Sequence, residues 1–232
     1  MLKKLILSIV RNIKMKNDFS TVSSEFWERC WRSENLDELM RFLAGYVNLG
    51  GEIFDIFKNH GVKKVCDAAC GFGGYSLAFA TNGFTVSGFD ISPTAVKITC
   101  DGLNSYGIDS SGFKTADILN TGYADGEFDG VVAHAVIDHL TVADAQNAVK
   151  ELCRITAHGG LVFISFDTAE PDDLAYEHEM IEPGTMLYTD GSQKGMLFHP
   201  YEWDEIDSLL SGLEVIYRKQ NAKNEKSVIV RK

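Results

Sequence analysis

The stretch Asp67-Ala68-Ala69-Cys70-Gly71-Phe72-Gly73-Gly74 decides the fold of this chain. It follows a short strand-like run, Val62 to Cys66, and leads into a helical pattern over Tyr75 to Ala80. Glycine lets the main chain approach a ligand closely and adopt a positive φ, and the N-terminus of a helix presents unpaired N–H groups. An acid near the end of a strand, a glycine-rich turn and a helix together predict a backbone pocket that is open to a ligand.

A second acid, Asp90, ends the next strand-like run, Phe84 to Phe89. A carboxylate at this place can accept hydrogen bonds from two ribose hydroxyls. The dinucleotide fingerprint G-x-G-x-x-G is incomplete, because the third glycine after Gly71 and Gly73 is absent. Asp67 also argues against a dinucleotide, since its carboxylate would repel a pyrophosphate and attract an ammonium or sulfonium group. The residues favour a positively charged nucleoside such as S-adenosylmethionine.

These motifs resemble those of the class I S-adenosylmethionine-dependent methyltransferases. The family's motifs match, in order, Asp67 to Gly73, Asp90, Ala116-Asp117-Ile118, Phe128 to His134 with the following Asp138-His139-Leu140, and His158-Gly159-Gly160. Five motifs in register are a more specific signal than any one of them. Ala69 stands where many members have glycine, and we expect it to adopt a β-region conformation.

The resemblance implies a role for each matched residue. Asp67 would face the methionine amino group, Asp90 would hold the ribose, and Asp117 would accept from the adenine amino group. The residues expected to bind the cofactor S-adenosylmethionine, and its product S-adenosylhomocysteine, are Asp67, Ala68, Ala69, Gly71, Gly73, Asp90, Ile91, Asp117, Ile118 and His134. Structural alternatives stay open: Asp67 could cap the turn, and Asp90 could cap the next helix, although Ser92 already serves there.

Histidines and tyrosines supply the candidates for the acceptor side. A histidine beside the cofactor could orient an acceptor or take its proton, so the catalytic candidates are His134, His139 and His199. The expected substrate pocket comprises Tyr75, Asp138, His139, Tyr188, His199 and Tyr201. Each of these residues could instead be a packing residue. The spacing of the cysteines does not resemble a zinc site, and we expect no metal.

Strands and helices alternate from residue 62, which predicts an α/β, Rossmann-like, doubly wound sheet with helices on both faces. The resemblance implies seven strands, mostly parallel, with the last strand antiparallel. Residues 1–16 read as a dispensable basic extension, and residues 17–232 as a single methyltransferase domain that begins with a helical cap over 17–60. Ser92-Pro93 is a strong helix start, because serine caps and proline suits the first helical position.

Two segments border the predicted pocket. Trp27 and Trp31 lie four residues apart on one helix face, where they would either cover the donor as a lid or pack onto the sheet edge. Residues 168–200 break the alternation and predict a lid-like insertion with a hairpin around Asp190-Gly191, on the ligand side of the sheet. The acids from Glu170 to Glu182 could attract a cationic acceptor or form a solvated face.

Composition narrows the class of partner. The chain has 232 residues, 45% of them hydrophobic, which suits one globular domain. Its net charge of −11 argues against a nucleic-acid partner, which usually needs a basic face. No apolar run approaches the roughly 18 residues of a spanning helix, and five cysteines without a pairing pattern favour a reducing cytoplasm. We expect a cytoplasmic monomer or homodimer without a membrane partner.

The sequence therefore predicts a methyltransferase that passes the methyl group of S-adenosylmethionine, by in-line displacement, to a small-molecule acceptor. The donor is already activated, so the protein mainly supplies alignment and exclusion of water. A small acceptor is preferred because the charge is wrong for nucleic acid and no Asn/Asp-Pro-Pro-aromatic tetrapeptide occurs. Two alternatives stay open: a non-catalytic protein that binds an adenosyl ligand and, with less support, a nicotinamide-dependent oxidoreductase.

Overall fold

The computed structural model describes residues 21–169 and 173–232. The basic extension expected over residues 1–16 lies outside the described residues, as do Glu170 and Asp172 of the acidic stretch. The described chain begins with a helix over residues 21–33, called the N-terminal helix below, and continues with α2 (Leu36–Ala44) and α3 (Glu52–Asn59). The helices expected before residue 60 are therefore present in the described part.

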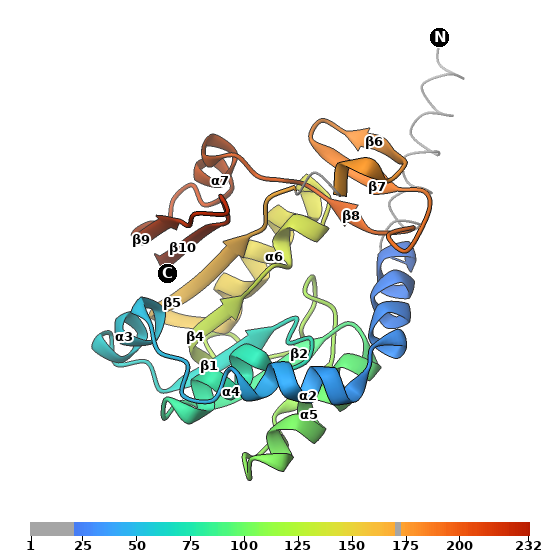
Figure 1. The fold of residues 1–232 in the computed structure, drawn as a ribbon. Helices are drawn as coiled ribbons and strands as arrows, with labels where there is room; N and C mark the ends of the chain where they lie inside the picture. The colour runs from blue at the N-terminus through green and yellow to red at the C-terminus, as the bar shows by residue number, and fades with distance from the viewer. Residues whose placement is uncertain (1–20, 170–172) are drawn as a thin grey trace.

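A seven-stranded sheet forms the centre of the fold (Figure 1). Its strands are β1 (Lys64–Ala68), β2 (Thr85–Asp90), β3 (Phe113–Thr115), β4 (Phe128–Ala133), β5 (Thr156–Phe166), β9 (Glu214–Gln220) and β10 (Lys226–Arg231). Their order in space is β3-β2-β1-β4-β5-β10-β9, and β10 runs antiparallel to both of its neighbours. The predicted doubly wound sheet is confirmed. The strand order reverses between β1 and β4, and ligands of such sheets bind in the crevice at that point.

Helices cover both faces of the sheet because both faces are apolar. Successive strand residues point to opposite faces, so Val65 and Val132 pack in the cluster that contains residues of α3 and α4 (Gly74–Thr81). Cys66 and Val131 pack on the other face, in the cluster of α6 (Val142–Ile155) and α7 (Trp203–Leu209). The remaining helix, α5 (Pro93–Ser105), contacts β2, β3, α4 and α2 near one edge of the sheet.

The start of α5 follows the prediction from the sequence. Pro93 is its first residue, and the Ser92 hydroxyl accepts a hydrogen bond from the Ala95 N–H at 3.0 Å. Because β2 ends at Asp90, this cap fixes the backbone immediately after the second acid. The start of α5 therefore holds the carboxyl end of β2 in place.

Residues 173–200 form a second, smaller sheet. After the short helix η2 (Asp173–Ala175), the strands β6 (His178–Glu182), β7 (Thr185–Tyr188) and β8 (Leu197–Phe198) pair in the order β6-β7-β8. The antiparallel pairing of β7 with β8 confirms the predicted hairpin. Strand β6 was not predicted, because its exposed, acidic sequence reads as a solvated face.

The small sheet packs against the N-terminal helix, beside which it lies in Figure 1. Phe26 of that helix is buried in one cluster with Met186, Tyr188, Met196 and Phe198. The Arg29 guanidinium donates a hydrogen bond to the Lys194 carbonyl oxygen at 2.6 Å. The two segments that the sequence suggested as lids therefore form one packed unit.

Candidate functional site

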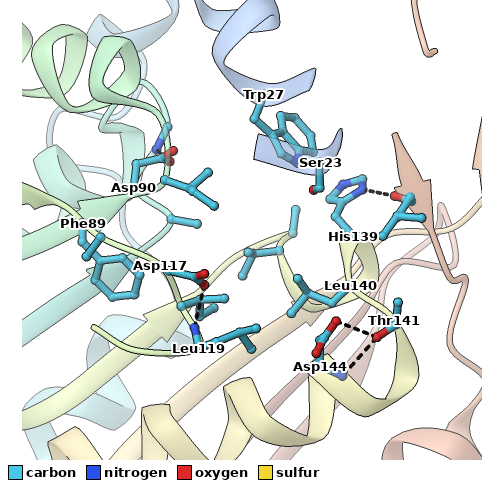
Figure 2. Close-up of a pocket in the computed structure, with 18 of the residues that line it drawn as sticks. Ser23, Trp27, Phe89, Asp90, Asp117, Leu119, His139, Leu140, Thr141 and Asp144 are labelled. Atoms are coloured by element: carbon cyan, nitrogen blue, oxygen red, sulfur yellow. Dashed lines mark hydrogen bonds between the residues drawn. The ribbon is translucent and has the colours of Figure 1, made fainter. Parts of the chain in front are cut away.

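A cavity lies at the carboxyl ends of β1, β2 and β4, beneath the N-terminal helix (Figure 2). Seven of the predicted site residues line it: Ala69, Gly71, Asp90, Ile91, Asp117, Ile118 and His139. Figure 2 shows Asp90 and Asp117 on one side of the cavity, with His139 and Asp144 on the other and Trp27 above. Six of the ten predicted cofactor residues therefore gather at the switch point of the sheet.

Asp90 joins the glycine turn to the end of β2. Its side chain is buried, and its two oxygens accept hydrogen bonds from the backbone N–H groups of Gly71 and Ser92, each at 2.9 Å. Burial raises the pKa of Asp90, while backbone hydrogen bonds from Ser92, Gly71 and Ile91 act against that rise. A carboxylate oxygen can accept more than one hydrogen bond. Asp90 can therefore hold the turn and still accept from a ligand hydroxyl in the cavity.

The turn itself depends on left-handed backbone. Gly71 and Gly73 have φ values of +55° and +85°, which favour glycine. Ala69 has φ +58°, so the β-region conformation that we expected for it is wrong. A side chain in this region costs about 1–2 kcal/mol. Ala135, just beyond β4, has φ +49° and also lines the cavity. Backbone strain of this kind is often stored at functional sites.

Asp67 lies beneath the turn, not in the cavity wall. It is 3% exposed, and the Ser76 hydroxyl of α4 donates a hydrogen bond to it at 2.5 Å. Burial raises the pKa of Asp67 to about 7, although the hydrogen bonds from Ser76 oppose the rise. Ala68 and Gly73 likewise do not line this cavity. The expected contact of Asp67 with a methionine amino group stays a prediction.

Asp117 lies at the opposite side of the cavity from Trp27 of the N-terminal helix (Figure 2). Its carboxylate accepts a hydrogen bond from the Leu119 N–H at 2.8 Å, which fixes the loop after β3. Ile118 is buried beside it, and Ile91 follows Asp90 into the wall. This arrangement of one acid and two isoleucines suits a flat, partly polar ring, but the adenine contact itself stays a prediction.

His139 lies in the short helix η1 (Ile137–His139) and faces the cavity. Its Nδ1 lies 2.8 Å from the Leu197 carbonyl oxygen, which can only accept, so Nδ1 is the donor. In the neutral ring, Nε2 therefore keeps its lone pair. The ring also meets the edge of Trp27 at a centroid distance of 4.8 Å.

His134 and Tyr75 form a separate pair that does not line this cavity. Their rings lie 4.5 Å apart between centroids, and His134 remains exposed. The surrounding protein lowers the pKa of His134 by disfavouring its cation, against the attraction of Asp138 and Glu225. The predicted roles of these two residues remain untested.

Three further predicted substrate residues, Tyr188, His199 and Tyr201, are buried. Tyr188 lies in the cluster around Phe26, and Tyr201 packs on Phe166 at 5.1 Å between ring centroids. His199 is 1% exposed, and its ring nitrogens lie 2.8 Å from the Thr185 hydroxyl and 3.3 Å from a Glu205 carboxylate oxygen. None of the three lines this cavity, so their geometry favours packing over substrate contact.

The N-terminal helix is fastened to the body by Glu28, which the sequence did not single out. Its carboxylate accepts hydrogen bonds from the Ser92 hydroxyl at 2.5 Å and the Thr94 hydroxyl at 2.8 Å, and it pairs with Arg32 at 2.7 Å. Burial acts to raise the pKa of Glu28, but the hydrogen bonds from Ser92 and Thr94 outweigh it and lower the pKa. Trp27 and Trp31 therefore cover the cavity from a helix that is held at the start of α5.

Residues 66–164 match the family model of a methyltransferase domain. That range begins in β1 and ends in β5, and it contains the glycine turn with Asp90 and Asp117. Residues 66–164 thus form a methyltransferase domain that is similar to those of the class I S-adenosylmethionine-dependent methyltransferases. The resemblance inferred from the sequence is confirmed, and the expected cofactor is the one that this family uses.

Curated relatives in the family cover part of the chain. Ajmaline N-methyltransferase from Rauvolfia serpentina is 33% identical over 104 residues, which are 44% of this chain and 35% of that protein. The chloroplastic tocopherol O-methyltransferase from Arabidopsis thaliana is 34% identical over 105 residues, 44% of this chain and 30% of that protein. The matched stretch thus spans about a third of the length of these relatives.

Solved structures share the fold over more of the chain. The PH0226 protein from Pyrococcus horikoshii OT3 has a TM-score of 0.66 at 19% identity, covering 76% of this chain and 85% of that one. A SAM-dependent methyltransferase from Methanosarcina mazei has a TM-score of 0.64 at 22% identity, covering 76% and 96%. At these identities the likeness concerns the fold alone.

Proposed function

We propose that this chain transfers the methyl group of S-adenosylmethionine to a small-molecule acceptor by in-line displacement. The observation that carries the proposal is Asp90, a buried carboxylate that anchors the glycine turn and borders the cavity. The match of residues 66–164 to the methyltransferase domain model supports S-adenosylmethionine as the donor. Ajmaline and tocopherol, which name two of the curated relatives, are small molecules, and this supports a small acceptor here.

The donor would lie across the cavity between the two acids. In this proposal Asp90 accepts from the ribose hydroxyls, and Asp117 accepts from the adenine amino group with Ile91 against the ring. Gly71 and Ala69 bring the backbone close to the remaining part of the donor. Trp27 and Trp31 exclude water from above. Because the donor is already activated, the protein contributes mainly alignment and exclusion of water.

On the acceptor side we propose His139 as the residue nearest to the reacting atoms. It is the one predicted catalytic histidine that lines the cavity, and the Leu197 carbonyl fixes its orientation. The acidic net charge of −11 supports the expectation of no nucleic-acid partner. In the part of the chain that the structure describes, no helix is long and apolar enough to cross a membrane. A cytoplasmic monomer or homodimer remains our expectation.

Calorimetry separates this function from its two rivals. We expect S-adenosylmethionine and S-adenosylhomocysteine to bind one per chain, and NAD to give no heat of binding. Tight binding of NAD without a response to S-adenosylmethionine would favour the oxidoreductase. Release of S-adenosylhomocysteine across a panel of amine, phenol and thiol acceptors then distinguishes an enzyme from a protein that only binds the donor.

The contacts of Glu28 predict that the N-terminal helix controls exchange of the donor. Glu28→Gln removes the charge that accepts from Ser92 and Thr94, so the N-terminal helix should open more readily. We expect S-adenosylhomocysteine to dissociate roughly fivefold faster, corresponding to about 1 kcal/mol. Stopped-flow fluorescence of Trp27 and Trp31 measures this rate. Glu25→Gln, an exposed site one turn earlier on the same helix, is the matched control. Equal rates in the two variants would show that the Glu28 contacts do not hold the N-terminal helix closed.

A further inference from the structure

Three potential metal ligands meet beside the cavity, where the loop after β4 approaches the end of β5. Asp138, His139 and Asp167 each offer one ligand atom, and these atoms all lie within 4.8 Å of one another. Asp138 and His139 belong to η1, and Asp167 directly follows β5. His139 also lines the cavity, so the three residues adjoin the candidate donor site.

Asp138 carries the strongest sign that something else binds here. It is 0% exposed, and one of its oxygens accepts a hydrogen bond from the Asp167 N–H at 2.9 Å. Within the described residues its other oxygen, Oδ1, is buried and has no hydrogen-bond partner. A buried carboxylate oxygen without a partner is costly, and native structures seldom leave one unexplained. A bound cation would satisfy this oxygen and offset its charge.

The surroundings of His139 resemble those of a metal-binding histidine. Such a residue usually donates its second ring N–H to a carbonyl or carboxylate, which fixes the tautomer and leaves the other nitrogen for the metal. The Nδ1–H of His139 donates to the Leu197 carbonyl in this way. Nε2 is then the nitrogen with a lone pair. This hydrogen bond is a second observation, independent of the unpaired oxygen of Asp138.

We propose that Asp138, His139 and Asp167 bind one divalent transition-metal ion, of the kind represented by Mn²⁺ and Zn²⁺. Two carboxylates would suit Mg²⁺ or Ca²⁺ as well, but an imidazole nitrogen favours a transition metal over these hard cations. Three protein ligands leave coordination positions open for water or a substrate atom. We expected no metal from the sequence, although Asp138 and His139 were predicted pocket residues. Asp138 and Asp167 are 29 residues apart, and only the sheet brings them together.

Metal binding can be measured without donor, acceptor or turnover, so its failure would not count against the proposed methyl transfer. The chain is stripped with a chelator, dialysed, and titrated separately with MnCl₂, ZnCl₂ and MgCl₂ by calorimetry. Bound Mn²⁺ is also counted by electron paramagnetic resonance. We expect one Mn²⁺ or Zn²⁺ per chain, with Mg²⁺ binding more weakly.

Two variants and a control make the assignment specific. Asp138→Asn and Asp167→Asn should each weaken binding of Mn²⁺ by about tenfold or more, whereas Asp55→Asn, an exposed acid on α3, should leave it unchanged. Asp167→Asn keeps the backbone N–H that holds Asp138, so it serves if the Asp138 variant misfolds by circular dichroism. Binding well below one ion per chain at millimolar metal, or equal affinity in Asp167→Asn and the parent chain, would overturn the site and leave a buried water as the partner of Asp138.

Discussion

Replacing Asp90 with alanine should weaken binding of S-adenosylmethionine by about 1–3 kcal/mol, a loss of roughly 5- to 150-fold in affinity. The carboxylate is proposed to accept from the ribose hydroxyls, and alanine cannot replace those hydrogen bonds. The change also frees the N–H groups of Gly71 and Ser92, which now donate to Asp90. The turn would then lose one of the contacts that fix it to the end of β2. Calorimetry with S-adenosylhomocysteine measures the effect without turnover.

A second carboxylate supplies the control for this experiment. Asp101 lies on α5, the helix that follows β2, and its side chain is exposed and pairs with Lys97 on the helix surface. Asp101→Ala should therefore leave the affinity of the donor unchanged. Thermal denaturation of both variants separates a loss of binding from a loss of folding. Unchanged affinity in folded Asp90→Ala would show that the ribose lies elsewhere and would remove the main support for the proposed donor site.

The fold was predictable because its signals are local. Ser92-Pro93 specifies a helix start by its own chemistry, and the cap is present at 3.0 Å. Strands that are apolar on both faces predict a covered parallel sheet, and the alternation of Val65 and Cys66 between two clusters shows this directly. Strand β3 has only three residues and a weak pattern, so it could be inferred only from the acid that follows it.

The site was predictable only where it is built from strand ends. Asp90, Asp117 and the turn follow consecutive strands, and parallel strands bring their carboxyl ends to one edge. The acceptor side is assembled from contacts between distant segments, which one sequence cannot reveal. His199 was a catalytic candidate from the sequence, yet the structure buries it against Thr185. Glu28 gave no signal, because a single glutamate on a polar helix face is ordinary.

Ala69 illustrates how a local rule can mislead. Alanine normally avoids a positive φ, so a β-region conformation was the reasonable expectation. The structure instead gives it φ +58°, immediately before Cys70, whose N–H donates to the Phe89 carbonyl oxygen at 2.9 Å. Tertiary contacts across β1 and β2 therefore override the preference of the residue. Strain at this point is consistent with a backbone shaped for a ligand more than for its own stability.

Donor binding should depend on pH through Asp67, whose buried carboxyl has a pKa of about 7. A cationic amino group binds the ionised carboxylate better than the neutral acid. If Asp67 faces that group, the affinity for S-adenosylhomocysteine should increase by about tenfold for each unit by which the pH rises toward 7, and it should level off above pH 7.

The stability of the free chain should change in the opposite sense, decreasing as the pH rises. Burial favours the protonated acid in the folded state, so this contribution is lost as the pH rises from about 4 to 7.

Two comparisons isolate Asp67 from the other acids of the site. The ligand 5′-methylthioadenosine keeps the adenine and ribose but lacks the amino group, so its affinity should stay nearly constant between pH 5.5 and 8, a range set around the pKa of about 7. Any titration of Asp90, whose pKa is also raised, would affect both ligands and cancel in the ratio. Asp67→Asn should abolish the slope for S-adenosylhomocysteine. Parallel profiles for the two ligands would mean that Asp67 only caps the turn through Ser76, and that the amino group is bound by other residues.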